Sequence, residues 1–388
     1  MTAPDTTDAA RAAALRGFLR TMAANWSGLG WDGRGFHERL TPALGPAGAA
    51  HRRLHLCARQ LYVLCRAPAL LGVEVPAALP PTVFATLAER FRDPVHGGFF
   101  STLDLEGAPL DRRKDLYGHA FVLFGAAAYH AATGDAAALA LAHETYDALV
   151  RHLAVPGGWF ASMAAEDWRE PDTALAQNPN MHLLEACLAL EATDADPAWA
   201  ARADRLVALF HSRLYDPAAR QLGEFYDRAG LPDLAAGHVV EPGHQFEWSW
   251  LLHAHAIRRG RPPDDAAGAL IDQAAVSGID REQDGIWDRI GRAGAVIAET
   301  KRIWPVCEAI KAYAARWRRA ARPDDLAAFR HWVDFLLAQY LRDGGRWHEI
   351  LNRDLTPLLS EMPGTTPYHL LMMAEEALPV LEGSVQQG

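Results

Sequence analysis

Three histidines stand shortly after a proline, at places where a helix is expected to begin. His182, His244 and His369 each follow a proline within three residues, and proline is well tolerated in the first turn of a helix. The positive end of the helix dipole lowers the pKa of a nearby histidine, so we expect His369 to be neutral and able to accept a proton near pH 7. The pattern predicts general acid–base catalysis by imidazole rings.

Two of these histidines are followed, three residues later, by a glutamate. Glu185 therefore lies on the same helix face as His182, and Glu247 on the same face as His244. We expect Glu247 to hold one ring nitrogen of His244, which fixes the tautomer and leaves the other nitrogen toward a cavity. A capping histidine with a surface glutamate is the alternative. Both pairs could bind a metal ion, but no third close cluster completes a ligand shell, so we predict neither a metal nor another cofactor.

Other side chains have the chemistry needed to hold a sugar. An indole such as Trp304 stacks on the C–H face of a sugar ring. A guanidinium such as Arg59 stabilises an oxyanion that forms during a reaction. Glu308 could accept hydrogen bonds from hydroxyl groups, and Tyr117 is placed with these residues by the repeat described next.

A glycine followed closely by an aromatic residue recurs six times, at intervals of 60 to 68 residues. Such a period indicates one supersecondary unit used six times. A polar or ionisable side chain lies 19 to 29 residues after each glycine, and these side chains are Arg59, Tyr117, His182, His244, Glu308 and His369. Residues at equivalent places of equivalent units converge if the units close into a ring.

The segments between these turns read as pairs of helices. Ala, Leu and Arg at helical spacing predict helices over residues 116–132, 137–153, 181–191 and 199–214. Strand signals are confined to short pieces beside the glycines. We therefore predict an all-α (α/α)6 barrel with short β-hairpins at one rim, formed by residues 1–388 as one domain. An open superhelix is the competing architecture, but it has no single axis on which the polar residues could meet.

Composition narrows the class of protein. The chain has 388 residues, half of them hydrophobic, and a formal net charge of −10, which opposes binding to nucleic acid. It shows neither a secretory leader nor an apolar run of about 18 residues. The four cysteines lie in apolar helical segments without metal-ligand spacing, so we expect buried, reduced thiols and a cytoplasmic location. No exposed apolar stripe stands out, and both a monomer and a homodimer are expected states.

The motifs resemble those of the N-acylglucosamine 2-epimerase superfamily. The resemblance is carried, in family order, by residues 115–121, 178–185, 242–248, 302–305 and 366–369. It spans roughly residues 50 to 375 and implies an (α/α)6 barrel. It also implies that the sugar pocket is lined by Arg59, Tyr117, Asn178, His182, His244, Glu247, Trp304, Glu308 and His369. The resemblance implies that His244 and His369 form the acid–base pair, with His182 assisting. The sequences of the motifs are most similar to those of the mannose isomerase branch.

These residues, together with the resemblance, predict a cofactor-independent isomerase that acts on a monosaccharide. It would interconvert D-mannose, or a related aldose such as D-lyxose, and its 2-ketose, D-fructose in the case of mannose, through a cis-enediol. His369 would move the proton between C2 and C1, His244 would assist ring opening and polarise the oxygen, and Arg59 would hold the oxygen on which charge develops.

Three alternatives remain at this point. A 2-epimerase of the mannose/glucose, N-acylglucosamine or cellobiose type would share the first half-reaction and reprotonate C2 from the other face. Glycoside hydrolysis by Glu247 and Glu308 would leave three histidines unexplained. A sugar-binding protein without turnover is the alternative outside enzymes.

Overall fold

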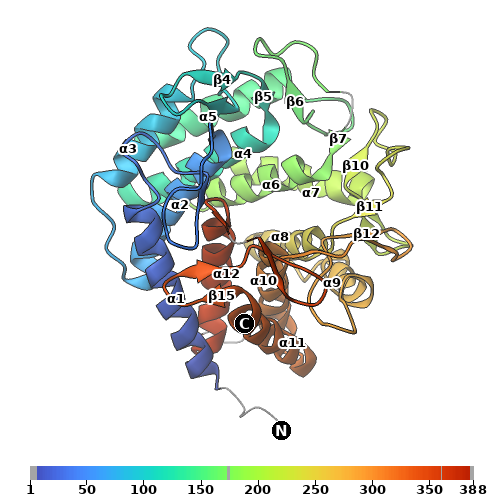
Figure 1. Cartoon of the computed structure of the whole chain (residues 1–388). Coiled ribbons are helices and arrows are strands. Elements are labelled where there is room, and N and C mark those ends of the chain that lie inside the picture. Colours follow the sequence, from blue (N-terminus) through green and yellow to red (C-terminus); the bar gives the residue numbers. More distant parts are fainter. Residues whose placement is uncertain (1–6, 173–174, 360, 385–388) are drawn as a thin grey trace.

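Six helices form a closed inner ring in the computed structural model, which describes residues 7–172, 175–359 and 361–384 (Figure 1). Each helix of the ring packs against the next, and the last returns to the first. The ring consists of α2 (Leu54–Leu71), α4 (Leu116–Thr133), α6 (Gln177–Glu191), α8 (Pro242–Arg258), α10 (Ile303–Ala320) and α12 (Thr366–Leu381). This closure confirms the predicted (α/α)6 barrel and excludes the open superhelix.

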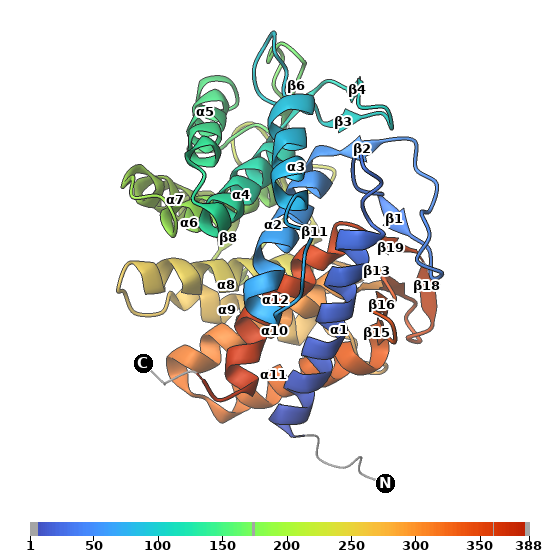
Figure 2. The same ribbon diagram turned by 90° about the vertical axis from the view of Figure 1, so that its left-hand side faces the viewer.

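An outer layer of helices packs around the ring (Figures 1 and 2). Within the described residues it consists of α1 (Asp8–Gly28), α3 (Leu79–Ala85), α5 (Ala136–His152), α7 (Ala198–Leu209), α9 (Asp265–Ser277) and α11 (Pro323–Phe335). These helices bury one face only. In α5 the buried residues Ala138, Leu141, Ala142, Thr145, Tyr146 and Leu149 recur at the three- and four-residue spacing of an amphipathic helix.

The helix boundaries follow the sequence prediction closely. The helices predicted over 116–132 and 137–153 are α4 and α5. Helix α6 begins four residues earlier than predicted because Pro179 fits inside its first turn. Helix α7 ends at Leu209, and the predicted segment continues as a π-helical turn, η2 (Phe210–Leu214). Turns of the same kind follow two other outer helices, as η1 (Thr86–Arg90) and η3 (Leu336–Tyr340).

Close packing of the inner ring depends on a glycine in α4. A Cβ atom added at Gly125 would lie 3.0 Å from the carbonyl oxygen of Ala58 in α2. Backbone cannot move aside as a flexible side chain can, so only glycine allows the two helices to approach this closely. The apolar residues of both layers form one continuous core cluster that extends from α1 to α12.

Short strands join the repeats at one rim of the barrel. The strand that leads into each inner helix pairs antiparallel with a strand of the next repeat. These pairings are β2 (Arg52–Arg53) with β3 (Thr102–Leu103), β5 (Lys114–Asp115) with β6 (Met163–Ala164), β7 (Leu175–Ala176) with β10 (Phe225–Tyr226), β11 (Val239–Val240) with β12 (Arg289–Gly291), and β14 (Lys301–Arg302) with β17 (Ile350–Leu351). The pairing of β19 (Met362–Pro363) with β1 (Arg39–Leu40) links the last repeat to the first.

Hairpins extend this rim, as predicted. The strands β4 (Pro109–Asp111), β13 (Val296–Ala298) and β18 (Pro357–Leu359) fold back on β3, β12 and β17. Two separate hairpins are β8 (Tyr215–Asp216) with β9 (Gln221–Leu222), and β15 (Leu341–Arg342) with β16 (Arg346–Trp347). Figure 2 places β1 to β4 and most of the later strands along one side of the barrel. Beside Gly98 and Gly158 the chain forms only isolated antiparallel bridges. Phe99 pairs with Arg92, and Phe160 pairs with Ala154.

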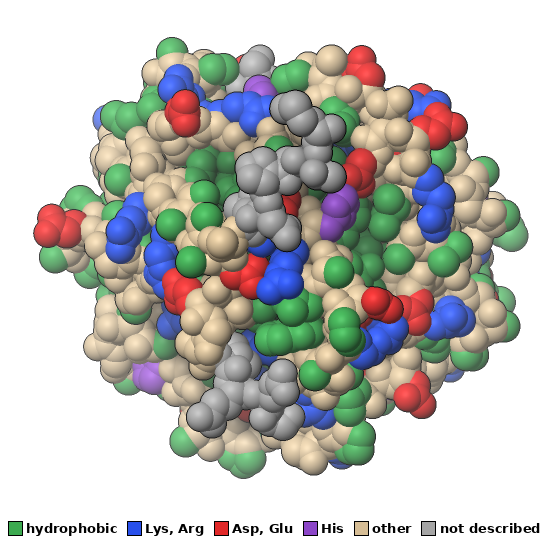
Figure 3. Space-filling model, turned by 90° about the horizontal axis from the view of Figure 1, so that it is seen from below, with side chains coloured by type: hydrophobic (Ala, Val, Ile, Leu, Met, Phe, Trp, Pro, Cys, Tyr) green, Lys and Arg blue, Asp and Glu red, His purple; other side chains and the backbone are tan. Residues whose placement is uncertain are grey.

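The cysteines of the barrel are buried, and charges of both signs lie on its surface (Figure 3). Cys57, Cys65, Cys187 and Cys307 are all free and buried, as predicted. On the face shown in Figure 3, basic and acidic side chains of the described residues lie interspersed, and surface ion pairs of this kind each contribute about 0 to 1 kcal/mol. Among the described helices, none has the length and apolar character needed to cross a membrane.

Candidate active site

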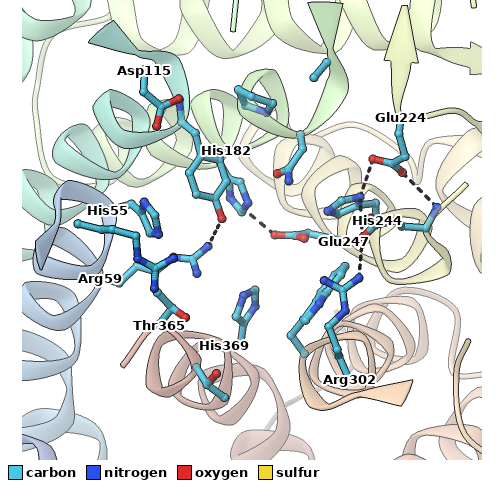
Figure 4. A pocket seen from close by; sticks show the side chains of 18 of the residues that line it. His55, Arg59, Asp115, His182, Glu224, His244, Glu247, Arg302, Thr365 and His369 are labelled. Carbon is cyan, nitrogen blue, oxygen red and sulfur yellow. Dashed lines mark hydrogen bonds and ion pairs between the residues drawn. The ribbon is translucent and has the colours of Figure 1, made fainter. Parts of the chain in front are cut away.

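A cavity of about 600 Å³ opens at the rim where the strands enter the inner helices. Every inner helix contributes to its lining from its first turns or from the residue just before it. Figure 4 shows these side chains converging on the centre of the ring. Eight of the nine residues proposed for the pocket line it: Arg59, Tyr117, Asn178, His182, His244, Glu247, Trp304 and His369. Most of the side chains at equivalent positions of the six repeats thus lie around one cavity.

His244 lies at the start of α8, against carboxylates from the rim. Its Nδ1 donates to Oε2 of Glu224 at 2.9 Å, and Glu241 lies 3.9 Å away. Burial alone would lower the pKa of His244, but the carboxylates of Glu224 and Glu241 outweigh burial and raise the pKa to about 9. The ring is therefore an imidazolium at neutral pH, and its Nε2–H is left to donate into the cavity.

The expected pairing of Glu247 with His244 is wrong. The carboxylate that fixes the His244 tautomer is Glu224, which arrives on the rim loop twenty residues earlier. Glu247 lies one turn deeper in α8 and faces His182 instead, with Oε1 3.8 Å from the Nδ1 atom of that ring. Spacing along one helix could not reveal a partner that comes from a neighbouring strand.

His369 lies across the cavity, at the start of α12. Its Nδ1 donates to Oε1 of Glu308 at 3.0 Å. Burial lowers the pKa of His369 to about 4, although Glu308 acts in the opposite direction. The ring is therefore neutral, as predicted, and its Nε2 lone pair is available to the cavity. Burial, rather than the helix start alone, is the main physical cause.

Glu308 does not line the cavity, which corrects its expected role as a substrate-binding residue. Its side chain is fully buried behind His369. One oxygen accepts from His369, and the other lies 2.7 Å from Nζ of Lys311 in the same helix. Position 308 is one helical turn beyond Trp304, so it points below the cavity floor while Trp304 faces the cavity.

Trp304 stands between the two catalytic candidates. Its ring centroid lies 5.0 Å from that of His244 and 5.8 Å from that of His369. A Cβ at Gly243 would lie 2.4 Å from the indole, so this glycine makes room for the ring beside α8. The indole offers a flat apolar surface with an imidazole at either edge, which suits a sugar lying on it.

His182 and Glu247 lie deeper in the ring. Nδ1 of His182 donates to Oε2 of Glu185 at 3.1 Å, and the same oxygen accepts a hydrogen bond of 2.5 Å from the hydroxyl of Tyr368. Burial lowers the pKa of His182, so the ring is neutral. Burial and the nearby charge of Glu308 raise the pKa of Glu247 well above its usual value. This shift favours the neutral acid form of Glu247, and within the described residues neither of its oxygens has a hydrogen-bond partner.

Arg59 is held rigidly by aromatic rings. Its Nη2 donates to the Tyr117 hydroxyl at 2.6 Å. The guanidinium carbon lies 4.1 Å from the Phe121 ring centroid and 4.7 Å from that of Tyr368. Cation–π contacts of this kind keep the charge in place without a carboxylate to neutralise it. Asn178, nearby on α6, has a buried Oδ1 without a partner in the described chain, which is free to accept from a hydroxyl.

One group of side chains has the donor atoms for a metal ion. His182, Glu185 and Glu247 bring ligand atoms within 4.8 Å of one another, and they are the only such group found among the described residues. Lys311 interacts with the same glutamates and is held charged by them. Its ammonium therefore already supplies a positive charge at this place. The absence of a metal requirement stays a prediction.

Several residues of the site were missed from sequence. Glu224, Glu241, Arg302 and His55 all line the cavity. A signal for Glu224 was available, since it directly follows the glycine of its repeat, Gly223, and Asp288 follows Gly285 by three residues; Glu38 takes the equivalent role from eight residues after Gly30. Each of these carboxylates accepts from the backbone N–H of the residue just before the next inner helix; those residues are Glu241, Arg53 and Arg302. His55 precedes Arg59 by four residues, which places both on one helix face.

Comparisons with known proteins show the family and the fold. The family model described as N-acylglucosamine 2-epimerase (GlcNAc 2-epimerase) matches residues 35–373. A mannose-6-phosphate isomerase of Rhizobium meliloti (strain 1021) is 32% identical, over 71% of this chain and 73% of the relative. A D-mannose isomerase of Thermobifida fusca is 29% identical over 76% of both chains. The solved structure of cellobiose 2-epimerase from Bacillus thermoamylovorans B4167 superposes with a TM-score of 0.85 at 20% identity, over 96% of this chain and 99% of that one.

Proposed function

We propose that this chain, which belongs to the N-acylglucosamine 2-epimerase family, interconverts D-mannose, or a related aldose such as D-lyxose, and the corresponding 2-ketose. For D-mannose the product is D-fructose, and the intermediate is a cis-enediol. The observation that carries the proposal is the opposite protonation of two rings that face one cavity. The pKa of His244 is raised to about 9, whereas the pKa of His369 is lowered to about 4. An acid and a base ready at the same neutral pH are what a proton shift between C1 and C2 requires.

The proposed steps balance with these two rings alone. Nε2 of His369 takes the proton from C2 of the open-chain aldose while His244 gives its proton to O1, which forms the enediol. His369 then returns the proton to C1, and O2 gives its proton back to His244. The product is the 2-ketose, and both rings regain their starting protonation. The same His244 proton would assist ring opening beforehand.

Two further side chains support the reaction. Within the described residues Arg59 forms no ion pair with a carboxylate, so its guanidinium would hold the oxygen on which charge develops, an effect of about 3 kcal/mol at comparable sites. The raised pKa of Glu247 favours its neutral acid form, and neither of its oxygens has a hydrogen-bond partner among the described residues, so it would both donate to and accept from sugar hydroxyls. Tyr117, Asn178 and Trp304 would orient the sugar.

The charges at the cavity mouth favour a sugar without a phosphate at C6. Nε of Arg53 donates to Glu38 at 2.6 Å. Nη2 of Arg302 donates to Glu241 at 3.0 Å, and Arg289 donates to the same carboxylate at 3.1 Å. A phosphate would have to break these ion pairs and lie beside their carboxylates, because each arginine at the mouth is already neutralised. We therefore propose the free aldose, in contrast with the name of the Rhizobium relative.

The second candidate is 2-epimerisation, for which the family model is named. Epimerisation needs a neutral base on one face of C2 and a protonated acid on the other, so a neutral His369 and a charged His244 would serve it as well as isomerisation. The protonation of the two rings therefore supports both reactions, and the product formed from D-mannose separates them.

One incubation separates the candidates. The protein is mixed with D-mannose in heavy water, and products are resolved by chromatography and proton NMR. Fructose carrying deuterium at C1 is the expected product. Glucose as the sole product would reject the isomerase, and fructose that fully retains the substrate hydrogen would reject the enediol. Mannose 6-phosphate, run in parallel, should react at least tenfold more slowly if the mouth excludes phosphate.

A further inference from the structure

The chain uses lysine in an unusual way. Only three lysines occur among its 38 lysines and arginines, and all three are fully buried. Lys114 and Lys301 each pair with an aspartate 21 residues earlier, on the loop that leads into an inner helix, at 2.7 and 2.9 Å. These two occupy equivalent places of two repeats and serve the fold. Lys311 lies instead inside the ring, in the middle of α10.

Lys311 lies among the acidic groups beneath the sugar cavity. Its Nζ is 2.7 Å from Oε2 of Glu308 and 3.8 Å from the ring centroid of Trp250. Glu247 from α8 and Glu185 from α6 also act on its charge. Other ionisable groups that feel this ammonium are Cys307 on the same helix and His369 on α12. On the far side of Trp250, the indole donates to Glu376 at 3.0 Å, and Glu376 in turn contacts Arg318.

The charges in this cluster balance only with Lys311 in place. Burial disfavours the ammonium, but the carboxylates of Glu308 and Glu185 outweigh burial and raise the pKa of Lys311. Burial likewise disfavours ionised Glu308, but Lys311 and His369 lower the pKa of Glu308 to about 2. Glu308 and Glu185 are then carboxylates, Glu247 is a neutral acid, and the charges of Lys311 and Arg59 compensate the two carboxylates.

We infer that Lys311 is a positioning residue for the proposed reaction, because by keeping Glu308 ionised it holds the proton of His369 on Nδ1 and leaves the Nε2 lone pair facing the sugar. This inference rests on the proposed function, since it concerns the base of that reaction. The geometry carries it: Glu308 bridges His369 and Lys311 with its two oxygens, at 3.0 and 2.7 Å.

Removal of the ammonium would reverse this tautomer. A buried Glu308 without a counterion takes up a proton. Its O–H then donates to Nδ1 of His369, and the ring must carry its own proton on Nε2. A ring protonated on Nε2 cannot accept the proton from C2. Lys311 therefore controls a group that it does not touch, through one shared carboxylate.

The kinetic test uses Lys311→Met, with Lys311→Gln as a second neutral variant, Lys311→Arg as the conservative variant and Lys301→Met as the matched control. In the two neutral variants kcat for mannose should fall roughly 10- to 100-fold at pH 7, with KM nearly unchanged. The acid limb of kcat/KM should move up by about one pH unit or more, so that activity recovers at higher pH. Arg should restore most of the rate. Lys301→Met should lower the melting temperature without moving that limb.

A second readout does not depend on turnover. In protein labelled with 15N-histidine, long-range proton–nitrogen NMR reports which nitrogen of His369 carries the proton, and His369→Asn assigns the signal. Wild type should show the proton on Nδ1 at pH 7, and the neutral variants should show it on Nε2. An unchanged tautomer or an unshifted acid limb in a folded neutral variant would overturn the role of Lys311. A tautomer change in a protein that converts no sugar would instead reject only the proposed function.

Discussion

On two sides of one cavity a histidine is hydrogen-bonded to a glutamate, but the imidazole ring is charged on one side and neutral on the other. On the α8 side, His244 donates from Nδ1 to Glu224 at 2.9 Å, and its pKa rises to about 9. On the α10–α12 side, His369 donates from Nδ1 to Glu308 at 3.0 Å, and its pKa falls to about 4. The local hydrogen bond is nearly identical, so it cannot be what decides the protonation of the ring.

The difference lies in how many charges surround each pair. His244 faces two carboxylates, Glu224 and Glu241, both of which favour the imidazolium. The charge of Glu308 is shared with Lys311, and both Arg59 and Lys311 act against a second positive charge on His369. A carboxylate bonded to a histidine therefore fixes the tautomer, whereas the balance of the remaining charges decides whether the ring is an acid or a base.

The largest expected effect comes from removal of the base. His369→Asn should lower kcat for mannose about 10²- to 10⁴-fold, because the substitution removes the group proposed to take the proton from C2. Binding of the sugar, measured by calorimetry, should change little. His253→Asn is the matched control, since His253 is also buried, on α8, but does not line the cavity. Equal loss of binding and turnover in His369→Asn would show that the ring serves the structure of the pocket instead.

The contrast between the two rings also predicts the pH dependence of the wild-type enzyme. His369 must be neutral, so kcat/KM should fall as the pH drops below about 4. His244 must be protonated, so kcat/KM should fall as the pH rises above about 9. A broad plateau between these limbs, measured with mannose in overlapping buffers, is the expected profile, limited at the acid end by unfolding. A single limb near pH 6.5 would contradict the assignment of widely different pKa values to His369 and His244.

Glu224→Gln should lower the pKa of His244 on the α8 side of the cavity while leaving the pKa of His369 unchanged. The amide keeps the shape but loses the charge, so the pKa of His244 should fall, and the alkaline limb should move down by about one unit or more. Activity at pH 6 should stay close to wild type, while activity at pH 8.5 should fall about threefold or more. An alkaline limb that stays near pH 9 would mean that Glu241 alone suffices, which Glu241→Gln would then test.

The smallest expected effect concerns metal ions. Because Lys311 already supplies positive charge to Glu185 and Glu247, prolonged treatment with EDTA should leave kcat and KM unchanged within error. Added Zn²⁺ or Mn²⁺ should not raise the rate. Loss of activity on chelation and its return with one metal would assign His182, Glu185 and Glu247 as ligands.

The repeat architecture could be predicted from the sequence for a simple physical reason. Each repeat contains a turn with a glycine followed closely by an aromatic residue. This pattern can be recognised in the sequence six times, which implies six equivalent units. The helix starts at His182, His244 and His369 were also readable, because a proline and a polar residue define a first turn locally. The pairing of His182 with Glu185 followed from helical spacing and is present at 3.1 Å.

The sequence by itself therefore determined eight of the side chains that meet in the cavity, since the periodic helices bring equivalent positions toward one axis. Only the tertiary structure decided how they act. The partners of His244 and His369 are Glu224 on a rim loop and Glu308 on a neighbouring helix, at separations of 20 and 61 residues that no local pattern reports. Their protonation depends on the sum of charges contributed by several helices at short range in a poorly solvated interior. That sum exists only once the ring has closed.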